Sequence, residues 1–472
     1  MRFEAAITRL AERECPAFAG REGAAGDFEE ATPMRFVREA GRALAATFLL
    51  ALVAAPALAT NGMYLAGYGS EAAGRGGANL AVADNALGLH ANPAGIMHIK
   101  GSELNVDVQF LAPSLKYGGD PLGNSMDGKS KVFAMPAISY VRGYPDSPWS
   151  WGIALISQGG MGATFETYTT PFGTTDQTSS EVRFATLTPT VAYRVNDKFA
   201  FGVSLNAGYS DVTFGFWPAT SFYSDGGTPM DPSDDMGFLG SELTTRAKAY
   251  TTSWRGGALW HAHPMVTFGA VAQSETKGDY ADGMLTLDQT VLGLGKVRYD
   301  ATVEGFTWPA QFGAGVELRP AKGWMIAADV RRYLWNHAMK QITVKGENPH
   351  VPSFVSAVEM PFVFNWEDQW VTNLGAEYAL NEAFTLRAGW NYGRSPVPDA
   401  TLNPLFPAIT TQHMTTGFSW KSDGNTVHFG LERAFEAEQV NLNTNPNENP
   451  FGPGMFVDHS QWTFSLGYGR AF

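Results

Sequence analysis

The chain is poor in cysteine, in charge and in long apolar runs. Only one of its 472 residues is a cysteine, Cys15, so the protein cannot form an internal disulfide or a thiolate metal cluster. Charged residues make up 17% of the chain, and the net charge of −13 offers no basic surface for nucleic acid. Beyond the N-terminal region, no stretch reaches the roughly 18 consecutive apolar residues of a membrane helix. These deficits exclude a disulfide scaffold, a nucleic-acid-binding protein and a helical membrane protein.

The N-terminus predicts an export signal. An arginine-rich region is followed by the apolar run Ala43–Ala55 and then by small residues at Ala57 and Ala59, the pattern that a signal peptidase cleaves. The apolar run is too short to anchor the chain in a membrane. We therefore expect residues 1–59 to be a signal peptide. A methionine directly ahead of the arginines leaves open that residues 1–33 come from a misassigned start.

The remaining chain alternates between bulky and small residues, most clearly at its end. In Gln461–Phe472 every second residue is bulky and apolar, except that Arg470 stands at one of these positions, and the residues between them are small or polar. The bulky residues are Trp462, Phe464, Leu466, Tyr468 and Phe472. A period of two is typical of a strand with two different faces. In a membrane barrel the bulky face meets lipid and the small polar face lines the lumen. A final phenylalanine behind such alternation resembles the C-terminal signal of bacterial outer-membrane proteins.

Similar segments recur along the chain and predict its topology. Fourteen are expected, near 101–113, 131–143, 149–161, 181–195, 198–216, 243–261, 265–278, 303–319, 323–345, 367–380, 383–395, 410–422, 425–438 and 460–472. Tight turns alternate with long loops such as 217–242, 277–302, 346–366 and 439–459, as in a barrel with short periplasmic turns and long external loops. The prediction is an all-β fold, a 14-stranded antiparallel transmembrane β-barrel over residues 101–472, in the bacterial outer membrane.

Strand parity places a set of charged side chains inside the expected barrel. They are Glu317, Asp329, Arg331, Glu377 and Arg387. Acids and bases on neighbouring strands lower each other's cost of burial in a confined space. Two interpretations stay open: a network that stiffens the wall, or a cluster that holds a plug inserted in the lumen.

A candidate plug precedes the first strand. Residues 60–100 lack strand alternation, are rich in glycine and end near Asn92-Pro93-Ala94. So many glycines cost chain entropy and make sense where a segment must fold in a narrow space. We expect this segment to be an N-terminal hatch inside the lumen, the alternative being a disordered periplasmic tail.

These residues resemble the FadL/TodX family of outer-membrane transporters of long-chain fatty acids and hydrocarbons. The resemblance is carried by Tyr68–Ala78, Asp84, Asn92–Ala94, Trp308–Glu317, Ala328–Val330, Trp335, Trp366–Trp370, Leu386–Tyr392 and Pro396–Pro398. It implies a barrel closed by its N-terminal hatch. A ligand would pass from an apolar external groove to an internal pocket, and leave sideways through the wall into the membrane. Asn92, Pro93 and Ala94 carry over as the hatch motif, whereas no pocket residue does.

Two apolar stretches in the expected loops are candidates for ligand contact. They contain Phe214, Phe216 and Trp217 in one case and Phe362 and Phe364 in the other. They favour a transporter of hydrophobic small molecules working by passive diffusion. A general porin, which would need an open charged constriction, and a barrel enzyme, which would need a catalytic constellation, remain as alternatives.

Two further sequence patterns resemble a phosphate-binding loop and a metal site, and both resemblances are weak. Gly123–Ser130 matches the letters of a phosphate-binding loop, but a strand rather than a helix is expected after it. His261 and His263 share a tight turn without an evident carboxylate partner. We therefore expect no catalytic residue, no metal and no cofactor. The expected partners are a hydrophobic ligand, the lipids of the outer membrane and the barrel assembly machinery, and no nucleic acid is expected.

Overall fold

The structure is a computed structural model that describes residues 61–82, 85–225, 236–353 and 355–472. All the described residues belong to one compact unit. The predicted signal peptide, residues 1–59, lies outside the described residues. Among those described, no helix has the length and apolarity needed to cross a membrane.

One 22-stranded sheet accounts for most of the described chain. The elements in chain order are α2 (Ser70–Gly74), α3 (Gly88–Ala91), η3 (Pro93–His98), β1 (Gly101–Gly118), β2 (Ser125–Asp127), β3 (Phe133–Gly143), β4 (Trp149–Thr169), β5 (Thr175–Arg194), β6 (Phe199–Ser224), β7 (Met236–Thr245), β8 (Ala247–His263), β9 (Val266–Gln273), β10 (Thr276–Lys277), β11 (Tyr280–Gln289), η4 (Thr290–Leu292), β12 (Gly295–Glu304), β13 (Thr307–Trp308), β14 (Gln311–Leu318), β15 (Trp324–Tyr333), α4 (Trp335–Ala338), β16 (Gln341–Glu347), β17 (Val358–Val363), β18 (Gln369–Ala379), β19 (Phe384–Gly393), η5 (Asp399–Thr401), β20 (Gln412–Ser422), β21 (Asn425–Asn441) and β22 (Met455–Ala471).

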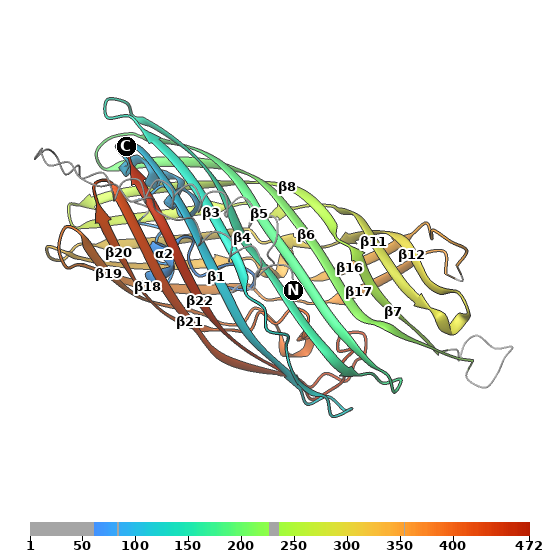
Figure 1. Cartoon of the computed structure of the whole chain (residues 1–472). Helices are drawn as coiled ribbons and strands as arrows, with labels where there is room; N and C mark the ends of the chain where they lie inside the picture. Colours follow the sequence, from blue (N-terminus) through green and yellow to red (C-terminus); the bar gives the residue numbers. More distant parts are fainter. Residues whose placement is uncertain (1–60, 83–84, 226–235, 354) are drawn as a thin grey trace, which may run out of the picture. The chain divides into compact units, whose positions relative to one another are not determined.

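The sheet closes on itself. The first long strand, β1, pairs with the last, β22, from Glu103 opposite Ala471 to Gly118 opposite Phe456. All pairs are antiparallel, and the circuit runs β1, β3, β4, β5, β6, β8, β9, β14, β15, β18, β19, β20, β21, β22 and back to β1 (Figure 1). Closure removes the two free edges that an open sheet would expose. The prediction of an antiparallel β-barrel is confirmed.

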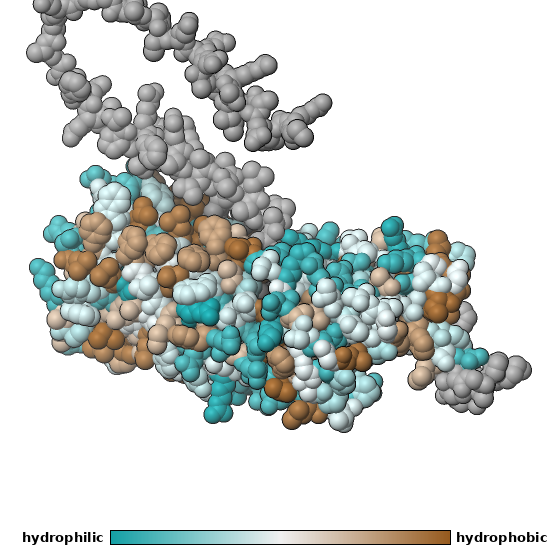
Figure 2. Space-filling view, turned by 60° about the horizontal axis from the view of Figure 1, so that its bottom comes forward, coloured by the Kyte–Doolittle hydropathy of each residue, from teal (hydrophilic) through white to brown (hydrophobic). Residues whose placement is uncertain are grey.

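The wall has an apolar outer face and a polar inner face. On β6, Phe201, Val203 and Leu205 are 51%, 57% and 63% exposed, whereas the intervening Ser204 and Asn206 are buried. This is the reverse of a water-soluble barrel, whose apolar residues would point inward. Figure 2 shows brown, apolar side chains concentrated over one half of the surface and more teal, hydrophilic ones over the other. The alternation therefore suits a wall with lipid outside it.

Several predicted loops form strands instead. The wall continues beyond the circuit of strands, where β6, β7, β11, β12, β16 and β17 pair in that order (Figure 1). We call this part of the wall the extension. The expected loops 217–242, 277–302 and 346–366 are therefore wrong in part, since β7, β11, β12 and β17 lie largely within them. The reason is that their inward-facing residues, Leu243, Leu285 and Val297 among them, are buried only when these segments pair into the sheet.

Four predicted strands are divided. The expected segment 323–345 is interrupted by α4, which buries Trp335 completely, and so becomes β15 and β16. The expected segment 303–319 is divided among β12, β13 and β14, 243–261 between β7 and β8, and 265–278 between β9 and β10. The parts of 303–319 and of 323–345 pair with different neighbours. For example, β15 pairs with β18 in the circuit, whereas β16 pairs with β12 in the extension.

The apolar outer face generates the first prediction. Leu205→Arg places a charge where the wall meets lipid, so the free energy of unfolding in lipid vesicles should fall by about 2–4 kcal/mol. Val351→Arg is the matched control, because Val351 is also half exposed but lies in the connection between β16 and β17. Urea titration of the refolded barrel measures both. Equal, small effects would show that lipid does not surround β6 at Leu205.

Candidate functional site

Residues 61–82 and 85–100, which we call the interior segment, pack against the buried side of the barrel wall. Helix α2 contacts β1, β19, β20, β21 and β22, and the turn η3 contacts β3, β4, β5, β6 and β8. The segment approaches the wall so closely that glycine is required on both sides. Gly76 has φ +65°, and a Cβ on it would lie 2.6 Å from the backbone nitrogen of Trp390. A Cβ on Gly389 of β19 would lie 2.2 Å from the backbone of Arg75.

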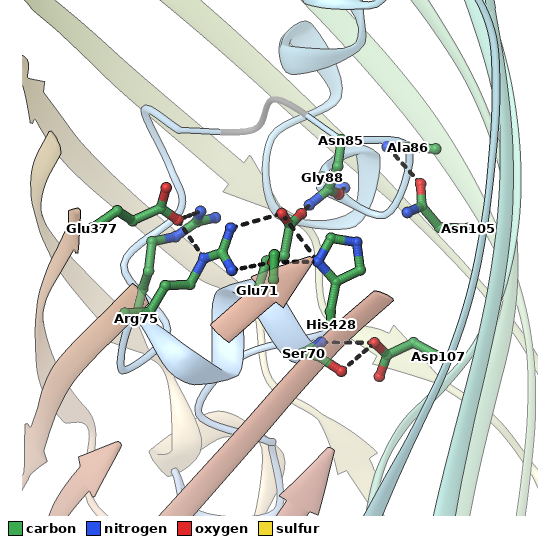
Figure 3. Close-up of polar contacts among 12 residues, drawn as sticks. Ser70, Glu71, Arg75, Asn85, Ala86, Gly88, Asn105, Asp107, Glu377 and His428 are labelled. Carbon is green, nitrogen blue, oxygen red and sulfur yellow. Dashed lines mark hydrogen bonds and ion pairs between the residues drawn. The ribbon is translucent and has the colours of Figure 1, made fainter. Parts of the chain in front are cut away.

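A buried ion-pair cluster fixes α2 to the wall (Figure 3). Arg75 Nη1 lies 2.5 Å from Glu377 Oε1, and Arg387 bridges Glu377 (2.6 Å) and Glu71 (2.9 Å). His428 Nδ1 lies 3.4 Å from the same Glu71 oxygen. Burial alone would raise the pKa of Glu71, but the charges of His428, Arg387 and Arg75 outweigh it and hold the pKa at about 2. Two of the predicted lumen residues, Glu377 and Arg387, thus meet residues of the interior segment.

A second cluster holds the chain just after α2. Asp329 Oδ2 accepts hydrogen bonds from the backbone N–H groups of Asn79 (2.7 Å) and Leu80 (2.9 Å). Arg331 donates to the Asn79 side chain at 2.5 Å and pairs with Asp329 at 3.3 Å. Glu317 belongs to neither cluster, because it pairs with Arg319 at the adjoining turn. The five predicted lumen residues therefore divide between two anchoring clusters and a separate pair.

Sequence reasoning missed the anchors that β1 provides. Asp107 Oδ2 accepts from both the backbone N–H (2.8 Å) and the hydroxyl (2.6 Å) of Ser70. Nearer the start of β1, Glu103 and Asn105 both accept from the backbone N–H of Ala86. Figure 3 shows the bond to Asn105. The sequence does contain a sign of these anchors, because Glu103, Asn105 and Asp107 alternate with apolar residues and share one face of the expected first strand.

Asn92 of the predicted hatch motif ties the segment both to itself and to the wall. Its Nδ2 donates to the carbonyl oxygens of Leu80 (2.7 Å) and of Ala258 in β8 (3.1 Å). Its Oδ1 accepts from the backbone N–H of Ala94 at 3.1 Å and so caps η3, in which Pro93 is the first residue. All three residues of the motif are buried. The side chain thus satisfies one donor and two acceptors of the backbone.

An apolar cavity lies where the circuit meets the extension. Every lining residue is apolar, and they are Val212, Phe214, Val303, Phe306, Ile342, Val344, Phe362, Phe364, Leu405 and Phe406. Three of the five predicted ligand-contact residues, Phe214, Phe362 and Phe364, line it. The other two, Phe216 and Trp217, stack on each other at 4.4 Å in an adjoining aromatic cluster with Phe238 and Phe451.

The placement of these aromatic residues in loops is wrong. Phe214, Phe216 and Trp217 lie within β6, and Phe362 lies within β17, with Phe364 just after it. The reason is that β6 continues to Ser224 and pairs with β7, so its apolar residues face the interior of the extended wall.

The connection between β19 and β20 folds inward and completes the cavity. Its Leu405 carbonyl accepts from the Ser180 hydroxyl, and its Thr401 hydroxyl donates to the Phe364 carbonyl at 2.5 Å. On β21, Asn441 Nδ2 donates to the Leu402 carbonyl at 3.1 Å. Leu402, Leu405 and Phe406 of this connection are all buried.

The backbone ladder of the wall is interrupted between β3 and β4. Their pairing runs from Gly143 opposite Ser150 only as far as Ala137 opposite Ile156. Beyond that point β3 pairs with β1 and β4 with β5, and no β3–β4 pair is formed among the described residues. Pro136 has no N–H to extend the ladder.

A bulge in β4 adjoins this interruption. The register of β4 against β5 shifts between Ser157 and Gly159, which leaves Gln158 as the extra residue. On the inner side, the backbone N–H of Gly160 donates to the carbonyl of Met63 at 3.1 Å, and Tyr64 forms a β-bridge with Gly159. We call the stretch between 133–136 and 157–160 the wall gap. The first described residues of the interior segment lie against it.

The sequence matches, over residues 50–472, the family described as outer membrane protein transport protein (OMPP1/FadL/TodX). The chain belongs to this family. It is 21% identical over 421 residues to the long-chain fatty acid transport protein of Escherichia coli (strain K12), an alignment that covers 83% of this chain and 90% of that protein. The resemblance noted from the motifs is thereby confirmed, and this FadL/TodX-family barrel is a transport protein of the bacterial outer membrane.

Solved structures share the fold of this FadL/TodX-family protein. The P. putida toluene transporter TodX superposes with a TM-score of 0.69 at 18% identity, covering 86% of this chain and 99% of that one. The Ralstonia pickettii toluene transporter TbuX superposes with a TM-score of 0.66 at 20% identity, covering 86% and 98%.

The contacts of Asn92 generate a second prediction. Asn92→Ala removes all three hydrogen bonds, so the interior segment should loosen while the ladders of the barrel stay intact. We expect uptake of a long-chain fatty acid by cells to change, with a normal amount of heat-modifiable barrel in the outer membrane. Asn381→Ala, in the exposed turn between β18 and β19, is the control. An uptake rate equal to that of the wild type would contradict a role for Asn92.

Proposed function

We propose that this protein admits hydrophobic small molecules, long-chain fatty acids or similar hydrocarbons, through the bacterial outer membrane by passive diffusion. The proposal assigns residues 1–59 as a signal peptide, 60–100 as a hatch and 101–472 as the transmembrane β-barrel. The observation that carries it is the combination of a wholly apolar cavity with a wall gap, in a barrel whose polar interior is occupied by residues 61–100.

The membrane-spanning part, in this proposal, is the closed circuit of fourteen strands. What supports this number is that each strand of the circuit pairs with a circuit neighbour on both sides, whereas β7, β11, β12, β16 and β17 join the circuit only through the pairs β6–β7 and β8–β11. An even number of strands returns the chain to the side on which it started, as bacterial barrels do.

The apolar cavity is the proposed site at which the ligand is first held. A cavity without polar lining residues binds by removing apolar surface from water, about 0.8 kcal/mol for each methylene buried. The relatives named above transport two classes of ligand, long-chain fatty acids in one case and toluene in the other. Both classes present the apolar surface that such a cavity takes.

The wall gap is the proposed exit. A molecule of about fifteen methylenes would lose on the order of 12 kcal/mol if released from an apolar site into water, at about 0.8 kcal/mol for each methylene. Release sideways into the bilayer avoids this cost. The gap is suited to it because the ladder that seals neighbouring strands elsewhere is absent between β3 and β4 at this point.

The hatch is the proposed barrier between the cavity and the gap, with Asn92, Pro93 and Ala94 as its stiff corner. Passage requires it to shift, since Met63 and Tyr64 lie against the gap. A general porin is less well supported, because an open lumen conflicts with the burial of nearly all described residues of 61–100.

We propose no catalytic role. Within the described residues, no three His, Cys, Asp or Glu side chains are grouped so as to hold a metal ion. The stretch Gly123–Ser130 contains the short strand β2 and leads to β3, so it lacks the helix on which a phosphate-binding loop depends. The proposed partners are the hydrophobic ligand, outer-membrane lipids and the barrel assembly machinery.

Closing the gap tests the proposed route. Met135→Cys with Gln158→Cys places a thiol on each side of the gap, and the chain's own Cys15 lies in the predicted signal peptide. When the pair is oxidised, uptake of a long-chain fatty acid should fall to the level of cells that lack the protein, and a reductant should restore it.

The control pair lies in the paired part of the same two strands. Ser139 and Ala154 are opposite each other in the ladder, so a disulfide between Ser139→Cys and Ala154→Cys should leave uptake unchanged. Mass spectrometry establishes that each disulfide has formed. If the oxidised gap pair transports as well as the reduced one, the ligand does not leave between β3 and β4.

A further inference from the structure

The outer face of the wall changes from apolar to charged partway along β5, β6 and β8, which lie side by side (Figure 1). On β6 every second residue from Phe199 to Leu205 points outward, is apolar and is exposed. Further along the same outer face the residues are Tyr209 and then Asp211. The outward residues of β5 and β8 at this level are charged as well, and they belong to the cluster described below.

The change lies at the height expected for the upper boundary of the membrane. β6 begins after the tight turn 195–198, and in bacterial barrels the short turns lie on the periplasmic side. With a rise of about 3.3 Å per residue and a tilt of about 35–45°, the step from residue 199 to residue 209 advances about 25 Å along the membrane normal. This distance matches the height of the apolar band of such barrels.

Two tyrosines mark the same boundary. Tyr209 lies opposite Tyr250 in the ladder of β6 and β8, and their ring centroids are 5.7 Å apart. Tyr250 is 82% exposed. Aromatic residues of this kind form the girdle at which the apolar band of a barrel ends. The charges beyond them therefore lie at the level of the lipid head groups in the outer leaflet.

The charged residues are joined by shared ion pairs. The carboxylate of Asp211 pairs with Arg183 at 2.6 Å and with Arg246 at 3.1 Å. Glu181, which points outward from β5, pairs with the same Arg246 and with Lys131 at 2.6 Å. Each carboxylate is therefore shared between two cations. The carboxylates hold the cations in place on the outer wall without neutralising all of them.

Lys248 adds a further positive charge to this surface. It is exposed, lies opposite Asp211 in the ladder, and forms no ion pair with any described residue. We call Lys131, Glu181, Arg183, Asp211, Arg246 and Lys248 the outer charge cluster. It holds four cations and two carboxylates and so carries a net charge of +2, whereas the whole chain has a net charge of −13. The cluster is thus a basic patch on an acidic protein.

We propose that the outer charge cluster binds the phosphate groups of a phosphorylated glycolipid in the outer leaflet. A guanidinium binds phosphate in a fork and an ammonium attracts it as a point charge, and the cluster offers both. The acyl chains of the same lipid would lie on the apolar residues below the cluster, among them Leu187, Val203 and Leu205. The inference concerns the lipid side of the wall and does not depend on the proposed transport.

The width of the cluster fits a lipid head group better than a single free ion. Its residues are spread over β5, β6 and β8, and neighbouring strands are about 4.8 Å apart, so the cluster is about 10 Å wide. A glycolipid with a phosphate at each end of its sugar unit can contact cations at both sides of such a patch. Inorganic phosphate reaches only one side and gains nothing from the apolar residues below.

Native mass spectrometry of the purified full-length protein in detergent tests the inference, with two glycolipid probes. The probes are bisphosphorylated lipid A and the same lipid after removal of its phosphates. The test variant is Lys131→Gln with Lys248→Gln, which leaves both arginines on Asp211. Its affinity for lipid A should fall about tenfold or more, because two cations near the head groups are lost, while the dephosphorylated lipid binds as it does to the wild type.

Lys198→Gln with Lys322→Gln is the matched control. It removes the same charge from exposed lysines of the short turns at the other end of the barrel. Its affinity for lipid A should equal that of the wild type. Both double variants should form heat-modifiable barrels, because none of the four lysines lies inside the wall. Millimolar inorganic phosphate, added as a competitor, should leave lipid A bound to the wild type.

Four results would overturn the inference. If Lys131→Gln with Lys248→Gln binds lipid A as the wild type does, the cluster is only a self-contained set of ion pairs. An equal loss in the control variant would show an effect of net charge alone. Equal affinity of the wild type for both glycolipids would show that the phosphates are not recognised. Displacement of lipid A by inorganic phosphate would mean that the cluster binds the free ion. None of these results bears on the proposed transport.

Discussion

The structure depends on how the polar inner face of the barrel is satisfied. With an apolar medium outside, the strands must turn their polar side chains inward, and buried polar groups without partners are costly. The interior segment has the complementary problem, since its irregular backbone leaves N–H groups that no ladder satisfies. The polar side chains of the wall and the backbone N–H groups of the segment therefore bond to each other. Asp329 accepts from two backbone N–H groups of the segment, and Asp107 and Glu103 accept from Ser70 and Ala86.

This mutual dependence explains why the two ends of the barrel differ. Where residues 61–82 and 85–100 pack against the wall, the interior is polar and bonded by carboxylates, amides and arginines. In the extension, the interior is apolar, and the inward fold of the connection between β19 and β20 buries residues such as Leu405 and Phe406. In the proposed function, an apolar ligand held at that end meets the polar groups of the interior segment, and the wall gap beside Met63 and Tyr64 is its way out of the barrel.

The sequence predicted well the strand alternation and the tight turns, which depend on residues close together in the chain. Alternation in Gln461–Phe472 identified the two faces of β22, and the tight turns identified most ends of the strands in the circuit. The segments from 367 to 422 agree with β18, β19 and β20 within a few residues. Such features depend on neighbours in the chain, so a single sequence carries them.

What the sequence could not predict depends on pairing between distant residues. The strand β16 pairs with β12 rather than with β15, its nearest neighbour in the chain, and nothing in the pattern of 341–347 indicates this choice. The wall gap depends on where the pairing of β3 and β4 stops.

The central claim is that residues 61–100 close the lumen, and ion conductance in planar bilayers tests it most directly. The full-length mature protein should be almost silent, because ions cannot pass a lumen whose polar groups are bonded to the segment. A variant that lacks residues 60–95 but still forms a heat-modifiable barrel should conduct strongly. If the two proteins conduct equally, whether both are silent or both open, the segment does not close the barrel and the account is wrong.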